Sequence, residues 1–300
     1  MEKLIQSLFH CPRCRGELLS NGQGSFACRG CGSAYALRNG ILDFGAREQE
    51  VANNWSGDSR EEAAQWVRQM LDAGFLTEDD LEWMRRNVDQ PELLKCWEKA
   101  VEAIRDVYRS PRTETIIDLA SGLGSVFSRK LGGGLDLGSL GRKTIILADL
   151  SRTALEGLRE RLEPDRGETS LIYAACDVAT LPLKDGVADA VSGVALLANA
   201  QRGEAILCQI ARALRSDGRF ALYDTFFEEG SRSQRIKVRM NGDLELTTLE
   251  RMEAAAGKAG LAVAEKTELY RGRGRMAGDL LPLSGEEQRC VLLKGGPARS

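Results

Sequence analysis

The chain has 300 residues and a formal net charge of −3, with 43% hydrophobic and 28% charged residues. This length favours about two domains, and so small a net charge provides no general attraction to polyanions such as nucleic acids. No apolar run approaches the roughly 20 residues of a membrane span. Residues 1–5 show neither a basic leader nor a long apolar stretch, so we expect a cytoplasmic protein without a signal peptide or membrane span.

Two Cys-x-x-Cys pairs dominate the first 45 residues. Cys11 and Cys14 form the first pair, Cys28 and Cys31 the second, and thirteen residues separate the pairs. Four thiolates with no open position describe a structural zinc site. Iron in a similar thiolate site is the alternative, and a redox dithiol is disfavoured because no βαβ pattern surrounds the pairs. We therefore predict a zinc ribbon over residues 1–45, with short strands at 17–19 and 25–27.

The residues around these cysteines follow a longer pattern. It reads Cys-Pro-x-Cys-x-Gly-x-Leu, then Phe-x-Cys-x-x-Cys-Gly-x-x-Tyr, then Asn-Gly-Ile-Leu-Asp-Phe, within residues 11–44. This pattern resembles the small zinc ribbons that accompany bacterial and eukaryotic methyltransferases of RNA and protein. Such a ribbon is either a scaffold or a substrate-recognition element. The second role would use a basic face that could touch phosphates, made by Arg13, Arg15, Arg29 and Arg38.

Residues 46–112 are predicted to form a helical cap or linker. Apolar residues fall on one helical face in 61–71, Thr77 is a good N-cap for a second helix, and Pro91 stands in the first turn of a third that covers 93–107. The four tryptophans of the chain either pack these helices on the following domain or form an apolar wall that excludes water from a substrate pocket. They are Trp55, Trp66, Trp83 and Trp97.

From residue 113 to residue 300, apolar strands and amphipathic helices alternate. Strands are expected at 116–119, 143–148, 171–175, 188–192 and 218–223, and helices at 125–131, 153–162 and 204–214. Such alternation predicts an α/β fold, a doubly wound Rossmann-like sheet with right-handed crossovers. Two late apolar runs, 261–268 and 290–294, are expected to pair antiparallel at one edge of it.

The most informative segment of this domain is 116–125, Ile-Ile-Asp-Leu-Ala-Ser-Gly-Leu-Gly-Ser. An apolar strand ends in Asp118 and the chain then turns through small residues. Two further strands end in acids, Asp149 and Asp177. Because the ends of parallel strands meet at one edge of a sheet, this layout predicts a pocket of the nucleotide-binding type at the carboxyl edge.

Three more motifs follow in order: Ala-Asp-Leu-Ser at 148–151, Cys-Asp-Val-Ala-x-Leu-Pro-Leu-x-Asp-Gly-x-Ala-Asp at 176–189, and Ile-Ala-Arg-Ala-Leu-Arg-Ser-Asp-Gly-Arg at 210–219. Together with 118–124 they resemble class I S-adenosylmethionine-dependent methyltransferases of the quinone and small-molecule type. The chain departs from that family at Ala120, where glycine is frequent, and in the long interval between the first two acids. A nicotinamide-binding domain is disfavoured because Phe127 stands where its third glycine is needed.

The resemblance implies S-adenosylmethionine as the cofactor. The loop residues would let the backbone approach the methionine end, whose carboxylate suits the start of the following helix. Asp118 would hold this loop and interact with the ammonium group, Asp149 would bind the ribose hydroxyls, and Asp177 would accept from the adenine amino group. The complete predicted set is Asp118, Ala120, Ser121, Gly122, Gly124, Asp149, Leu150, Asp177 and Val178.

Methyl transfer from a sulfonium is an in-line displacement that needs alignment and exclusion of water more than a base. The single histidine, His10, belongs to the ribbon, so a histidine base in the sheet domain is excluded by composition. The candidates near the reacting methyl are Asn199, Tyr223 and Asp224, after the fourth and fifth strands, with strand-end hydrogen bonds as the alternative role. The cysteines outside the ribbon are expected to be small buried residues rather than a thiol site.

Three functions are consistent with these residues. We expect a methyltransferase that acts on a small-molecule acceptor under the helical cap. The alternative is a methyltransferase of a ribosomal or transfer RNA base that uses the ribbon for recognition, since a ribbon followed by this domain resembles bacterial guanine-N1 methyltransferases of large-subunit ribosomal RNA. The third is a non-catalytic partner-docking protein that retains the cofactor fold.

Overall fold

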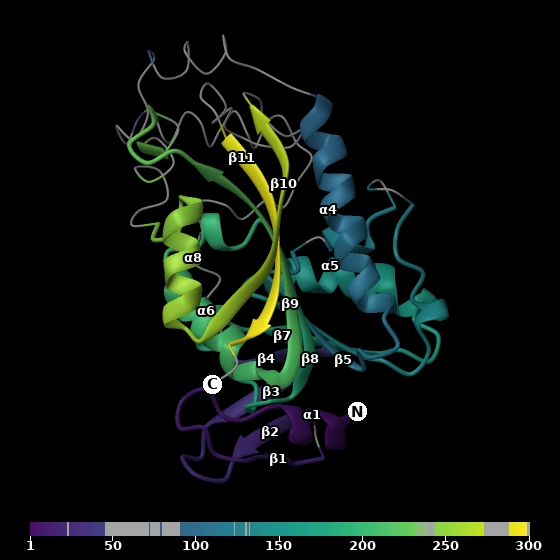
Figure 1. The fold of residues 1–300 in the computed structure, drawn as a ribbon. Helices are drawn as coiled ribbons and strands as arrows, with labels where there is room; N and C mark the ends of the chain where they lie inside the picture. The colour runs from purple at the N-terminus through teal and green to yellow at the C-terminus, as the bar shows by residue number, and fades with distance from the viewer. Residues whose placement is uncertain are drawn as a thin grey trace.

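One continuous sheet organises the molecule. The computed structural model describes residues 1–22, 24–45, 72, 79, 91–122, 124–129, 131, 133–232, 234–235, 238, 244–272 and 288–298. In these ranges eleven strands pair in the order β1-β2-β3-β4-β7-β6-β5-β8-β9-β11-β10 (Figure 1). Of the helical cap or linker predicted for 46–112, residues 46–90 fall almost wholly outside the described residues, as do Trp55, Trp66 and Trp83.

The N-terminal part forms a small antiparallel ribbon. Helix α1 (Glu2–Leu8) is followed by β1 (Leu18–Ser20), β2 (Ser25–Cys28), β3 (Ala34–Arg38) and β4 (Ile41–Asp43). Neighbouring strands of the four pair antiparallel. The two strands predicted from the sequence are therefore confirmed to within one residue.

The central strands are parallel and apolar. They are β5 (Thr115–Leu119), β6 (Thr144–Asp149), β7 (Ser170–Ala175), β8 (Ala188–Val194) and β9 (Leu214–Phe227). Both faces of these strands are buried, which explains why they read as apolar runs rather than as an alternating pattern. The predicted Rossmann-like α/β sheet is confirmed.

Helices cover the two faces of this sheet. Helices α4 (Pro91–Arg109) and α5 (Arg152–Leu162) lie against one face, and α6 (Gly203–Ala213) and α8 (Leu249–Lys258) against the other (Figure 1). Trp97 packs from α4 against the apolar cluster on its face, so the packing role holds for this tryptophan. Across the described ranges, no helix combines the length and the apolar character needed to cross a bilayer.

Short 3-10 turns connect strands and helices at both ends of the sheet. They are η1 (Ser125–Phe127), η2 (Gly138–Leu140), η3 (Glu163–Asp165), η4 (Val178–Thr180) and η5 (Leu197–Asn199). The prediction of a helix over 125–131 was wrong, because only η1 forms there and the backbone of Ser128 is already extended. The carbonyls of Val126 and Ser128, which a helix would have used, accept instead from the buried guanidinium of Arg105 at 2.8 and 2.9 Å.

The late apolar runs form the predicted antiparallel pair. Strand β10 (Leu261–Gly272) pairs with β11 (Gln288–Pro297), and β11 pairs with β9. The fifth parallel strand was predicted to end at Tyr223, but β9 continues to Phe227 because β11 pairs with its last residues. Tyr223 and Asp224 therefore lie inside a strand and not beyond its end.

The ribbon is attached to the parallel sheet by backbone pairing. Strand β4 runs parallel to β7, with Ile41 opposite Tyr173, Leu42 opposite Ala174 and Asp43 opposite Ala175. The rings of Phe9 and Phe44 stack at 5.5 Å in the core beneath this junction. The division into 1–45, 46–112 and 113–300 stays a prediction, although the first and third parts share one sheet.

A buried chain of hydroxyl groups ties α4 to the sheet. The Tyr108 hydroxyl lies 2.7 Å from Ser192 Oγ, and Ser192 Oγ donates to Asp118 Oδ1 at 2.7 Å. Only 3% of Asp118 is exposed. Burial raises the pKa of Asp118 from 3.8 to about 6, although Ser192 and Tyr108 hydrogen-bond to its carboxylate.

The burial of Asp118 predicts that the free energy of unfolding depends on pH. Between about pH 4 and pH 6 the folded state holds a proton on Asp118 that the unfolded state has released, so the free energy of unfolding decreases as pH rises through that window. Asp118→Asn keeps an acceptor for Ser192 and removes the charge. We expect the variant to be more stable than the parent at pH 7.5, by up to about 3 kcal/mol, and equally stable near pH 4.

Denaturant unfolding at the two pH values measures this difference. Asp106→Asn changes an exposed carboxylate on the same side of the sheet and should alter the free energy of unfolding by less than about 0.5 kcal/mol. A gain from Asp118→Asn that is the same at both pH values would contradict the assignment.

Candidate functional site

The loop after β5 turns at the carboxyl edge of the sheet in an unusual backbone conformation. Ala120 has φ 50°, Gly122 φ 48° and Gly124 φ 73°, all in the left-handed region. Ser121 fixes the turn, because its Oγ donates to the Asp118 carbonyl at 2.8 Å and its N–H donates to the Ala148 carbonyl at 3.2 Å. Left-handed backbone at a non-glycine residue stores strain, and strained residues cluster at functional sites. Ala195, directly after β8, shares this conformation with φ 54°.

Asp149 joins the end of β6 to this loop. Its Oδ2 accepts from the Gly122 N–H at 2.7 Å and its Oδ1 accepts from the Ser151 N–H at 2.8 Å. Burial raises the pKa of Asp149, and these backbone donors act in the opposite direction. Leu150 follows, partly exposed, and Ser151 caps α5 by accepting from the Ala154 N–H. The first and second acidic strand ends therefore meet around Gly122.

Asp177 stands at the end of β7, the next strand along the sheet. Its Oδ1 accepts from the Ala179 N–H at 2.8 Å and so begins η4, which contains Val178. Its Oδ2 lies 2.9 Å from Arg202 Nη1. Both Asp177 and Val178 are partly exposed. Asp118 is different, because it is the penultimate residue of β5 and not its last, and its carboxylate is buried against Ser192.

The three predicted catalytic residues occupy different surroundings. Asn199 ends η5, is partly exposed, and donates from Nδ2 to the Ala195 carbonyl at 2.7 Å. Asp224 is fully buried, and its carboxylate accepts from the N–H groups of Leu197 and Ala198 at 2.9 and 3.2 Å. Tyr223 is buried in the core on the α4 face, with its hydroxyl 3.4 Å from Cys96 Sγ. Asp224 therefore organises η5, and Tyr223 packs beneath the sheet edge.

Four residues that hold this edge together were not found from the sequence. Arg105 and Tyr108 act from α4, Ser192 acts from β8, and Arg202 reaches Asp177. Arg105 was detectable in principle, because it stands on the apolar stripe of its helix, four residues after Val101 and three before Tyr108. A charge in that stripe is a signal for a buried, specifically bonded group.

The four ribbon cysteines come together. Their Sγ atoms all lie within 4.8 Å of one another; Cys11 and Cys31 are 3.6 Å apart and Cys14 and Cys28 are 3.4 Å apart. A tetrahedron of thiolates about 2.3 Å from a metal places sulfurs about 3.8 Å apart, so the donor set fits a tetrathiolate metal ion. The Gly30 N–H donates to Cys28 Sγ at 3.3 Å, and the Tyr35 hydroxyl lies 3.0 Å from Cys11 Sγ.

The remaining cysteines do not gather at the sheet edge as one group. Cys96, Cys176 and Cys290 are buried, and Cys208 is exposed on α6. Cys96 and Cys290 share the same apolar cluster with Tyr223. The expectation of small buried residues is therefore confirmed for three of these cysteines and wrong for Cys208.

Comparison with known proteins agrees with this geometry. Residues 117–222 match a family model described as a methyltransferase domain. Over 127 residues the chain is 30% identical to the ubiquinone/menaquinone biosynthesis C-methyltransferase UbiE of Acidiphilium cryptum, in an alignment that covers 42% of this chain and 47% of that relative. The chain thus spans about half the length of this curated relative.

Solved structures share the fold at low sequence identity. The MccD protein has a TM-score of 0.53 at 14% identity and covers 66% of this chain and 96% of its own. The geranyl diphosphate C-methyltransferase of Streptomyces coelicolor A3(2), solved with S-adenosyl-L-homocysteine, has a TM-score of 0.50 at 12% identity, over 66% and 75% of the two chains. A geranyl diphosphate methyltransferase in complex with S-adenosylmethionine gives 0.51 at 12%, over 67% and 85%.

The family match covers the strands that carry the glycine loop and all three acids, and the solved structures share the sheet around them. Residues 117–222 are therefore similar to a methyltransferase domain, and the chain shares its Rossmann-like fold with these solved structures.

Proposed function

We propose that this protein transfers a methyl group from S-adenosylmethionine to a small-molecule acceptor. The observation that carries the proposal is the hydrogen bond from the Gly122 N–H to Asp149 Oδ2, at 2.7 Å. It joins the glycine loop to the second acid at the carboxyl edge, where nucleotide-type ligands bind in open α/β sheets.

The cofactor would lie across the ends of β5, β6 and β7. Ala120, Ser121, Gly122 and Gly124 allow the backbone to approach its methionine end. Each Asp149 oxygen uses one acceptor position on a backbone N–H and keeps another for a ribose hydroxyl. Asp177, beside Val178, would accept a hydrogen bond from the adenine amino group. Leu150 would lie next to the adenine base.

Asp118 would act from below the loop. When ionised it favours the ammonium group of the cofactor, and Tyr108 and Ser192 fix the direction of its carboxylate. Its charge is costly in the folded protein because burial raises its pKa to about 6. A bound ammonium group would offset that cost.

The bound cofactor supplies an electrophilic methyl group, and the protein has to align the acceptor and exclude water. We propose that Asn199 faces the acceptor, since it is the partly exposed member of the three candidates. Asp224 would position η5, and with it Asn199, through its bonds to Leu197 and Ala198. Tyr223 would support the same edge from the core.

A small molecule is favoured over RNA as the acceptor. The UbiE relative is by its name a quinone-pathway C-methyltransferase, and two structural neighbours are by their titles geranyl diphosphate methyltransferases. The basic face of the ribbon is partly neutralised, because Arg15 pairs with Asp185 at 2.5 Å and Arg29 with Glu17 at 3.7 Å. These contacts leave less positive charge for phosphates.

Gly122→Ala tests the cofactor site. A Cβ at Gly122 meets no protein atom closer than 3.8 Å, so we expect destabilisation on the order of 1 kcal/mol from the left-handed backbone alone. The new methyl group would stand where the cofactor must approach, so calorimetric titration should give at least tenfold weaker binding of S-adenosylmethionine. Gly157→Ala, in α5 with no neighbour within 4 Å, is the control and should bind normally. Undiminished affinity in Gly122→Ala would overturn the site.

Transfer of a labelled methyl group identifies the acceptor class. Purified protein is incubated with labelled S-adenosylmethionine and a cell extract, which is then separated into metabolite and RNA fractions. We expect label in the metabolite fraction, and its loss in Asp149→Asn but not in Asp136→Asn, whose carboxylate also accepts from a backbone N–H but in an exposed loop. Label confined to RNA would reverse the choice of acceptor, and cofactor binding without transfer to either fraction would favour the non-catalytic alternative.

We further propose that Cys11, Cys14, Cys28 and Cys31 hold one zinc ion. Elemental analysis should find one zinc per chain, and none in Cys28→Ser. Loss of a structural metal belongs to the large stability effects, so Cys28→Ser should lower the free energy of unfolding by on the order of 4 kcal/mol. Cys208→Ser, on the exposed face of α6, should change neither value. Finding iron in place of zinc would support the alternative, an iron site with four thiolate ligands.

A further inference from the structure

The segment that follows β7, residues 177–185 (the Asp177 loop), is held by the ribbon. The His10 N–H donates to the Pro182 carbonyl at 2.9 Å, and the Lys184 N–H donates to the Leu8 carbonyl at 2.8 Å. Between these bonds Phe9 forms an antiparallel bridge with Leu183. The Lys184 ammonium adds a bond to the Gln6 carbonyl at 2.7 Å. The backbone of the loop is thus paired with the ribbon at its far end.

The ribbon also holds the strand that leads into the loop. Strand β4 pairs with the last half of β7, and the Phe44 N–H donates to the Ala175 carbonyl at 3.0 Å. Ala175 is two residues before Asp177. The ribbon therefore contacts the chain on both sides of the acid that we assign to the adenine group.

Apolar contacts connect the metal ligands to the same loop. Phe9, Phe44, Leu181 and Leu183 are buried in one cluster, and the ring of Phe44 lies 5.2 Å from that of Tyr35. The Tyr35 hydroxyl is 3.0 Å from Cys11 Sγ. A series of contacts therefore runs from Cys11 through Tyr35 and Phe44 to the Asp177 loop.

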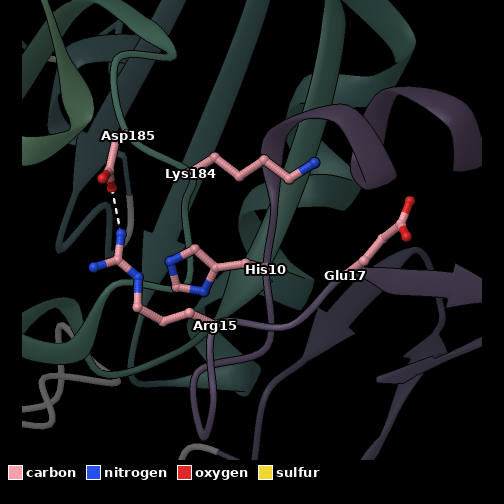
Figure 2. A pocket seen from close by; sticks show the side chains of 5 residues that line it. All are labelled: His10, Arg15, Glu17, Lys184 and Asp185. Atoms are coloured by element: carbon pink, nitrogen blue, oxygen red, sulfur yellow. Dashed lines mark hydrogen bonds and ion pairs between the residues drawn. The ribbon is translucent and has the colours of Figure 1, made fainter. Parts of the chain in front are cut away.

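On the surface, a polar hollow of about 370 Å³ marks the junction, lined by His10, Arg15, Glu17, Lys184 and Asp185 (Figure 2). Asp185 ends the Asp177 loop and accepts from two guanidinium groups, that of Arg15 at 2.5 Å and that of Arg212 at 2.6 Å. Arg15 directly follows the ligand Cys14, and Arg212 belongs to α6. Arg212 also donates to the carbonyls of Leu181 and Leu183.

We infer that the metal-held ribbon is a positioning element for Asp177, so that affinity for S-adenosylmethionine depends on the metal even though the metal lies outside the cofactor site. The inference rests on the proposed function. A ribbon with strands of three to five residues has too small a core to keep its shape alone. Without the metal, Leu8, Phe9, His10 and β4 would no longer hold the Asp177 loop in one place.

The first test removes the metal from the full-length protein with a chelator and titrates S-adenosylmethionine into both forms. We expect at least tenfold weaker binding by the stripped protein, restored when zinc is added back. Hydrogen exchange should rise in residues 173–185 while β5, at the centre of the sheet, stays protected. Equal affinity in the two forms would overturn the inference, whereas no binding by the metal-loaded form would overturn the proposed function.

A variant separates positioning from general loss of structure. Asp185→Asn removes the charge that bridges Arg15 and Arg212 but leaves all four cysteines, so its zinc content and its thermal midpoint should stay close to those of the parent. Because its partners are partly exposed, we expect a modest effect, about threefold weaker cofactor binding, seen as a higher KM for S-adenosylmethionine at unchanged kcat.

Asp165→Asn is the matched control, since Asp165 is similarly exposed and pairs with one arginine, Arg129 at 3.4 Å. It should bind the cofactor as the parent does. If Asp185→Asn binds the cofactor as tightly as Asp165→Asn does, the Asp185 contact does not position the loop and the inference fails on this arm. This comparison tests the contribution of the Asp185 contact even if the stripped protein unfolds.

Discussion

The parallel register of β5, β6 and β7 is the constraint from which the candidate site follows. Leu119 lies opposite Ala148 and Asp149 opposite Ala175, so three strand ends reach the same level and their acidic residues fall along one edge. The bond between Gly122 and Asp149 then ties the first of these ends to the second. A shift of one residue would point Asp149 to the other face of the sheet and separate it from the loop.

Helix α4 completes this edge from behind. Arg105 donates hydrogen bonds to two carbonyls of the turn that follows the glycine loop. The Tyr108 hydroxyl is hydrogen-bonded to Ser192, which in turn donates to Asp118. These are buried polar contacts, which specify one arrangement when every member is satisfied. The left-handed conformation of Ala120 is thus imposed by contacts on both sides of the loop rather than by its own preference.

Much of this could be predicted from local patterns. Apolar runs located the parallel strands, the spacing of the cysteines located the four-cysteine cluster, and the order of Asp118, Asp149 and Asp177 located the edge where the cofactor is proposed to bind. What was missed depends on distant partners. Strand β9 was predicted to end too early because its last residues form a strand only through their pairing with β11. The position of Arg105 in the apolar stripe marks it as a buried group, but the sequence does not reveal its carbonyl partners. The pairing of β4 with β7 joins residues far apart in the chain and leaves no periodic trace.

That last pairing has a consequence for solubility. Strand β7 is Ser-Leu-Ile-Tyr-Ala-Ala, with five of its six residues buried, and in the order of the sheet it would be the outermost parallel strand if β4 were absent. An exposed, uncharged strand edge of that kind can pair with further chains in intermolecular sheets. The ribbon instead presents β1, three residues long, as the terminal strand, and so shields the molecule from self-association along its most vulnerable border.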